Sequence, residues 1–195
     1  MELIFATNNR NKAEEIQHLI PQSIRVLTLE DVGLTGEIPE DQNTLEGNAS
    51  QKSRYVYDRF SKSCFADDTG LEIDALGGKP GVYSARYAGD DKDPEANMDK
   101  VLEELKDEDN RRARFRTVIS LILDGQELFF EGVVEGHILT EKRGEEGFGY
   151  DPIFLPEGSS LTFAQMPMNM KNRISHRSRA IKKLANYLNQ YSNPS

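Results

Sequence analysis

The sequence predicts an α/β fold built around a mixed β-sheet. Short apolar runs alternate with helical patterns over residues 3–107, which is the order of parallel strands joined by helices. The pattern changes in residues 114–139, which are predicted to carry two or three strands, and Asp124-Gly125 within them is a strong signal for a hairpin turn. Because a hairpin joins antiparallel strands, the sheet is predicted to contain both orientations.

Apolar spacing supports each predicted element in turn. In residues 11–20, Ala13, Ile16, Leu19 and Ile20 are expected on one helical face, and Pro21 ends the pattern. The strands are read from short apolar runs that end in turn residues. The predicted helices are 11–20, 44–60, 95–107 and 175–190, the predicted strands are 3–6, 24–29, 63–67, two or three segments within 114–139, and 152–156, and a glycine-rich structured loop is predicted at 71–90.

The composition is that of an ordinary globular chain of 195 residues, and we expect one domain over residues 1–195. The net charge of −9 argues against a protein that coats nucleic acid, which would need many Lys and Arg contacts to phosphates; the basic stretch 111–116 is interpreted as the solvated start of a strand. No run approaches the roughly 20 apolar residues that cross a bilayer, and no secretory signal is visible. The single cysteine, Cys64, excludes an internal disulfide. We therefore expect a cytoplasmic protein with neither a membrane nor a nucleic-acid partner.

Two adjacent carboxylates follow an apolar run in the stretch CFADDTG, residues 64–70. Asp67 and Asp68 are expected at the end of the strand, where Asp, Thr and Gly are also ordinary turn residues. A turn, however, does not need the whole arrangement over 65–89, in which glycine pairs are followed by Tyr83, Ser84 and Arg86 as returning donors. This longer assembly favours a metal-dependent site.

Two polar segments precede this stretch. ATNNRNK, residues 6–12, joins a strand to a helix and would expose free N–H groups to a phosphate, with Lys12 adding a charge; Thr7 or Asn8 acting only as a helix cap is the alternative. Glu40, Asp41 and Glu46 lie in the loop before the second helix and at its start, and they are candidate oxygen ligands for Mg²⁺; the alternative is that acids near a helix start are favourable for dipole reasons alone. Lys52, in that helix, is interpreted as a solvated surface lysine when taken by itself.

Two further motifs lie near the C-terminal end. In GFGYDPIF, residues 147–154, Phe148 between glycines is a candidate platform for a planar base, with ordinary packing as the alternative. Asp151 precedes Pro152, which predicts an extended backbone and an outward-facing carboxylate. In residues 170–180, Lys, Arg and His side chains crowd a helix start, where the helix dipole favours anions; this misfit is relieved by an anionic ligand, and a solvated basic face is the alternative.

Taken together, FATNNRNK, ADDTGLEIDALGGKPGVYSARYAG, GFGYDPIF and ISHRSRA resemble the inosine triphosphatase-like family, the non-canonical purine nucleoside triphosphate pyrophosphatases. The motifs occur in the order of the family and span nearly the whole chain. The resemblance implies an elongated mixed β-sheet with flanking helices and two lobes around a central nucleotide-binding cleft. It also implies a homodimer that uses Mg²⁺ to hydrolyse ITP, dITP and XTP to the monophosphate and pyrophosphate.

The resemblance also implies roles for individual residues. Asp68 falls at the catalytic and metal-binding aspartate, and Glu40 at a second metal ligand. The remaining matches are substrate contacts: Thr7, Asn8, Asn9, Arg10, Asn11 and Lys12 for the triphosphate, Lys52 on the phosphate side, Thr69 as a substrate-contacting hydroxyl, Phe148, Gly149, Tyr150 and Asp151 for the base, and Lys171, His176 and Arg177 for further nucleotide contacts. Three positions depart from the common pattern, because Asn8, Gln42 and Glu146 each stand where the family commonly has glycine.

We hypothesise that Asp68 and Glu40 hold Mg²⁺ and that Asp68 orients or deprotonates the attacking water. A donor aimed at the C6 oxygen of hypoxanthine or xanthine would be left unpaired against adenine, which explains part of the selectivity. Two alternatives remain: a pyrophosphatase of related fold that acts on other modified nucleotides, such as methylated pyrimidines, and a nucleotide sensor without catalysis.

Overall fold

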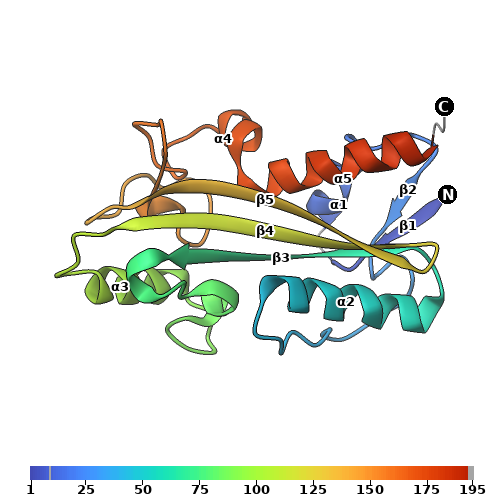
Figure 1. The fold of residues 1–195 in the computed structure, drawn as a ribbon, viewed down its shortest axis with the longest axis horizontal. Coiled ribbons are helices and arrows are strands. Elements are labelled where there is room, and N and C mark those ends of the chain that lie inside the picture. Colours follow the sequence, from blue (N-terminus) through green and yellow to red (C-terminus); the bar gives the residue numbers. More distant parts are fainter. Residues whose placement is uncertain (9, 193–195) are drawn as a thin grey trace. The chain divides into compact units, whose positions relative to one another are not determined.

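A computed structural model of the protein describes residues 1–8 and 10–192, without the side chains of residues 11, 12 and 15. Its elements are arranged around one six-stranded sheet (Figure 1). The strands are β1 (Glu2–Phe5), β2 (Arg25–Leu27), β3 (Cys64–Ile73), β4 (Arg112–Leu123), β5 (Gln126–Ile138) and β6 (Phe154–Pro156), and the helices are α1 (Arg10–Gln17), α2 (Leu45–Phe60), α3 (Pro94–Glu104), α4 (Met168–Ile174) and α5 (His176–Ser192), with short 3₁₀ helices at Asp74–Leu76, Gly81–Arg86 and Asp151–Ile153.

The sheet is mixed, as the sequence predicts. Its strand order is β2-β1-β3-β4-β5-β6; β1 runs parallel to both β2 and β3, whereas β5 and β6 are antiparallel. The hairpin between β4 and β5 turns at Asp124 and Gly125, whose φ angles of 49° and 78° are the positive values that a tight two-residue turn requires. The α/β class is therefore confirmed.

One prediction about a strand boundary is wrong. The strand that was expected to end at Asp67 continues to Ile73, so that Asp67, Asp68 and Thr69 lie inside β3. The low strand propensity of the two aspartates is overridden because the next apolar residues, Leu71 and Ile73, are completely buried.

The chain forms two compact units. The first comprises residues 1–68, 117–132 and the chain from 179 onward, and the second comprises 69–116 and 133–178. The three long strands β3, β4 and β5 contribute residues to both.

In the first unit, the alternation of side chains along β1 separates two cores. Leu3 and Phe5 pack with residues of α1 and α5, while Ile4 lies between them in sequence and packs with Val56 of α2. Figure 1 accordingly shows α1 and α5 on one face of these strands and α2 on the other. Cys64 belongs to the α2 core, and burial raises the pKa of its thiol to about 12, so it is an inert structural side chain.

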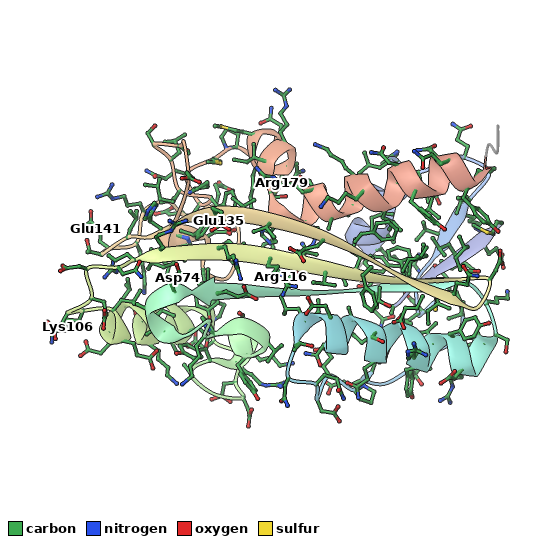
Figure 2. All side chains as sticks on the ribbon, in the orientation of Figure 1. Asp74, Lys106, Arg116, Glu135, Glu141 and Arg179 are labelled. Atoms are coloured by element: carbon green, nitrogen blue, oxygen red, sulfur yellow. The ribbon has the colours of Figure 1, made fainter. Side chains whose placement is uncertain are left out.

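In the second unit, α3 and the segments after β5 cover the strands. Met98, Val101 and Leu105, within the helix predicted at residues 95–107, form an apolar stripe and share a core with Phe154 and Phe163. Arg114 and Arg116 lie on β4 and pair with Glu72 on the neighbouring strand, at 2.7 and 3.4 Å. Arg116 is labelled in Figure 2. Glu72 thus offsets part of the positive charge of the basic stretch at 111–116. None of the described helices combines the length and the apolar character that a membrane span needs.

Candidate functional site

In the first unit, a lysine joins the acids that the sequence singled out. Lys52 is 9% exposed, forms an ion pair with Glu40, and donates to the carbonyl oxygen of Asp67 at 2.6 Å. Its Nζ also lies 3.8 Å from a carboxylate oxygen of Asp68. The interpretation of Lys52 as a solvated surface residue is therefore wrong, because the neighbouring carboxylates satisfy a charge that could not otherwise be buried.

Helix α2 places this lysine. Thr44 caps the helix with its hydroxyl, which accepts from the Gly47 backbone N–H at 3.0 Å. Positions 48, 51 and 52 then lie on one face, three and four residues apart. From that face Asn48 accepts from the Gln42 N–H at 2.9 Å, and Gln51 donates to the Asp41 carboxylate at 2.7 Å. The loop that carries Glu40 is thus tied to α2 at several points.

Asn48 is a site residue that sequence reasoning missed. It is 3% exposed, and its side-chain nitrogen donates to Oδ2 of Asp68 at 3.1 Å. An asparagine in the second turn of a helix carries no motif of its own. The available signal was its spacing of four residues before Lys52.

The described residues offer two carboxylates to a cation here. Glu40 is partly exposed and Asp68 is more enclosed, with 45% and 16% of their side-chain surfaces accessible. Across the described part of the chain, no group of three or more His, Cys, Asp or Glu side chains gathers into a metal site. Glu40 and Asp68 would each offer an oxygen ligand to a cation held here.

The predicted phosphate loop is only partly described. Asn9 lies outside the described residues, and so do the side chains of Asn11 and Lys12. The backbone of Thr7 accepts from the Leu29 N–H at 3.0 Å, which fixes the loop beside the segment after β2. Arg10 pairs with Glu30 at 3.0 Å and approaches Asp31 at 3.6 Å, so its exposed guanidinium is already engaged by two acids.

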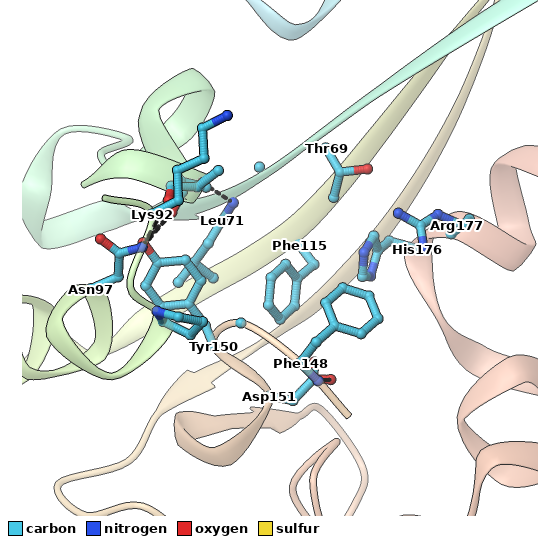
Figure 3. A pocket seen from close by; sticks show the side chains of 15 residues that line it. Thr69, Leu71, Lys92, Asn97, Phe115, Phe148, Tyr150, Asp151, His176 and Arg177 are labelled. Carbon is cyan, nitrogen blue, oxygen red and sulfur yellow. Dashed lines mark hydrogen bonds between the residues drawn. The ribbon is translucent and has the colours of Figure 1, made fainter. Parts of the chain in front are cut away.

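The second unit contains a cavity of about 320 Å³ (Figure 3). Leu71, Phe115 and Tyr150 give it apolar walls, while Thr69 and Arg177 add polar groups. A purine needs such a combination, because its faces are apolar and its edges are polar. The other residues lining the cavity are Gly70, Ser84, Ala85, Lys92, Pro94, Asn97, Phe148, Gly149, Asp151 and His176.

Aromatic surfaces are available at this cavity. Phe148 is 63% exposed, the most accessible of the large apolar side chains in the described chain. His176 is 5% exposed and stacks on Phe115 with centroids 4.7 Å apart and planes 16° apart. Arg177 holds its guanidinium carbon 5.8 Å from the centre of the Phe148 ring. A planar base can stack on Phe148 while cationic groups reach its edge.

A buried ion pair supports the loop that carries Phe148, residues 147–150, which we call the aromatic loop. Asp151 is 2% exposed, pairs with Lys171, and accepts from the Phe148 N–H at 2.9 Å. The Lys171 ammonium also lies 4.5 Å from the centre of the Phe148 ring. The expectation of an extended backbone and an outward-facing Asp151 is therefore wrong: the residue begins a 3₁₀ helix, and its carboxylate points inward to a lysine that the sequence places 20 positions away.

Ser84 connects the same loop to β3. Its hydroxyl accepts from the Leu71 N–H at 2.9 Å and donates to the Gly81 carbonyl at 2.6 Å, while its own carbonyl accepts from the Tyr150 hydroxyl at 2.6 Å. Burial raises the pKa of the Tyr150 phenol, which keeps this hydroxyl a donor at alkaline pH. The donors that the sequence predicts after Pro80 therefore include one that organises the cavity wall.

Gly147 provides a test of how tightly the aromatic loop is built. Its φ is +80°, and a Cβ at this position would stand 2.1 Å from Oδ2 of Asp151. We expect Gly147→Ala to lower the free energy of unfolding by about 3 kcal/mol, from the clash together with left-handed strain. The matched control is Gly149→Ala, where φ is +62° but nothing lies within 4 Å, so only the strain of about 1–2 kcal/mol applies. Urea unfolding of both variants measures the difference; equal losses would contradict the predicted clash.

Comparison with known proteins gives consistent matches over almost the whole chain. The family model described as "Ham1 family" matches residues 3–187. A dITP/XTP pyrophosphatase of Christiangramia forsetii is 52% identical over 190 residues, covering 97% of this chain and 100% of that protein. The dITP/XTP pyrophosphatase of Bacillus subtilis is 47% identical over 191 residues, covering 96% of each. A solved Ham1 protein from Staphylococcus aureus is 40% identical with a TM-score of 0.92, covering 96% of this chain and 98% of that one.

Proposed function

The chain belongs to the Ham1 family, and from this premise we propose that it hydrolyses the non-canonical purine nucleoside triphosphates dITP, ITP and XTP to the monophosphate and pyrophosphate. It is thus a hydrolase of phosphoric anhydrides that removes these nucleotides from the pool. The observation that carries the proposal is the approach of Glu40 and Asp68 to one buried ammonium, that of Lys52. Two acids kept together in this way suit the chemistry of a triphosphate, because they can share a cation with it.

The donor set fits Mg²⁺. This ion prefers one or two carboxylates and keeps its remaining positions for waters and substrate phosphates, and Glu40 and Asp68 are two such carboxylates within one unit. We propose that these two residues hold it. When bound, Mg²⁺ neutralises phosphate charge and stabilises the charge that develops at phosphorus.

Asp68 is proposed to act on the attacking water. One of its oxygens is occupied by the Asn48 amide, and the other faces Lys52. A carboxylate fixed in this way can orient a water molecule and accept its proton as the oxygen attacks the α-phosphorus. Lys52 holds the acid pair in place and offers positive charge to the phosphates as they approach.

The purine is proposed to bind in the second unit. Phe148 stacks on one face of the base, and Arg177 and His176 offer donors to its edge. A donor to the C6 oxygen distinguishes hypoxanthine and xanthine from adenine, because adenine would leave that donor unpaired. The ion pair of Asp151 and Lys171 fixes the shape of the loop that carries Phe148. Thr69, which follows Asp68 directly in β3, contributes a hydroxyl to the nucleotide.

The proposal also covers the segment that binds the triphosphate, the oligomeric state, the metal ion and the location of the protein. The segment Thr7–Lys12 is proposed to grip the triphosphate, with Lys12 as its principal charge. We also propose that the protein acts as a cytoplasmic homodimer that uses Mg²⁺, and that nucleic acid is not a partner. The acidity of the chain supports the last point, since its net charge is −9.

A nucleotide panel tests the proposed function. The purified protein is mixed with Mg²⁺ and dITP, ITP, XTP, dATP, dGTP or a methylated pyrimidine triphosphate, and monophosphate, pyrophosphate and orthophosphate are measured together. We expect equal amounts of monophosphate and pyrophosphate from the first three and much slower turnover of the others. Release of orthophosphate from dITP, binding without turnover, or a preference for the methylated pyrimidine would each overturn the proposal.

A further inference from the structure

Asn48 occupies a position that its own helix does not explain. It is the fourth residue of α2, where asparagine is a weaker helix former than alanine because its side chain competes for local backbone groups. Here it makes no such local bond. Its two polar atoms reach Gln42, six residues earlier, and Asp68, 20 residues later. A buried amide directed away from its own helix at both ends is a link between two other segments.

The orientation of this amide is determined by its partners. The Gln42 backbone N–H can only donate, so the atom that faces it at 2.9 Å is the Asn48 oxygen. The nitrogen therefore faces Asp68, at 3.1 Å from Oδ2. A neutral donor to an ionised carboxylate forms a charge-assisted hydrogen bond, which is stronger and more directional than a neutral one. This bond leaves Oδ1 of Asp68 on the side of Lys52, 3.8 Å from its Nζ.

We propose that Asn48 is a positioning residue for the reaction: it fixes the rotation of the Asp68 carboxylate and holds it in register with the loop that carries Glu40. The inference rests on the proposed function, because it assigns Asn48 a task in the turnover of that substrate. Asn48 touches neither water nor nucleotide in this role. Its amide donates to Oδ2 of Asp68, so that Oδ1 is the oxygen presented to the reacting groups.

An isosteric substitution of Asn48 can remove its bond to Asp68 while keeping its bond to the Gln42 N–H. Asn48→Asp keeps an oxygen for the Gln42 N–H but replaces the donor to Asp68 with a second acceptor. We expect kcat for dITP to fall about 10- to 100-fold, because the charge-assisted bond is lost and the new carboxylate repels that of Asp68, while KM changes less than about threefold. Gln51→Ala is the control. It removes a loop tether from the same helix face without touching Asp68, and we expect a loss of kcat below about threefold.

A second measurement does not depend on activity. In a ¹⁵N-labelled protein, the Asn48 side-chain NH₂ resonance is identified as the pair that disappears in Asn48→Asp, or in Asn48→Ser if that variant does not fold. We expect this pair to shift in Asp68→Asn and to stay in place in Gln51→Ala. The inference would be overturned if kcat of Asn48→Asp stayed within threefold of wild type or if only its KM changed. It would also be overturned if the NH₂ resonance did not shift in Asp68→Asn. Wild-type release of pyrophosphate from dITP is measured in the same series, so a failure of the proposed function is recognised separately.

Discussion

Asp68→Asn is expected to lower kcat for dITP by at least about 10³-fold while the protein stays folded. General-base assistance alone is worth roughly 10²- to 10⁴-fold, and the substitution also weakens a proposed ligand of Mg²⁺. Asparagine has the same shape, and its oxygen can still accept from the Asn48 amide, so the packing around β3 is preserved. Pyrophosphate release at saturating dITP gives kcat, and thermal unfolding followed by circular dichroism verifies the fold.

The neighbouring acid is the matched control. Successive side chains in a strand point to opposite faces, so Asp67 and Asp68 cannot both face the same water. The Asp67 carbonyl, which accepts from Lys52 at 2.6 Å, is backbone and survives substitution. We therefore expect Asp67→Asn to retain at least 100 times the activity of Asp68→Asn. Similar losses in both variants would show that the total negative charge matters and not the Asp68 side chain.

Local rules were sufficient for much of the fold. The hairpin at Asp124-Gly125 was predictable because few residue pairs tolerate two consecutive positive φ values, and this pair does. The stripe of Met98, Val101 and Leu105 identified α3, because the 3.6-residue period leaves little choice of buried face. In both cases the information lies within a few residues of the chain.

The site was less predictable because its contacts join distant segments. Whether Lys52 is solvated or buried depends on Glu40 and Asp67, and a helical pattern alone does not say which acids will face the helix. The burial of Asp151 depends in the same way on Lys171. Motif resemblance located these residues, but the partners that decide their electrostatic state come only from the tertiary fold.

Lys171→Met is expected to lower the free energy of unfolding by about 3–5 kcal/mol, because it leaves the Asp151 carboxylate buried without its partner. The two side chains are 8% and 3% exposed, so water cannot replace the lost ammonium without opening the loop. For a chain of this size, each kcal/mol shifts the unfolding midpoint by about 2–4 °C. Thermal unfolding measures the shift. The control is Lys62→Met, which removes an exposed pair with Glu2 at 2.9 Å and should leave the midpoint unchanged within error.

The double variant Asp151→Asn/Lys171→Met tests whether the unpaired Asp151 carboxylate causes the loss of stability in Lys171→Met. It removes the charge, and the new amide oxygen can still accept from the Phe148 N–H. If burial of an uncompensated carboxylate explains the loss, the double variant must be more stable than Lys171→Met alone, since neutral groups of similar shape often replace a buried pair at little cost. Its KM for dITP should nevertheless remain above that of wild type, because the ammonium that lies 4.5 Å from the Phe148 ring is gone. If the double variant is no more stable than Lys171→Met, the loss of stability comes instead from the lost packing of the Lys171 side chain.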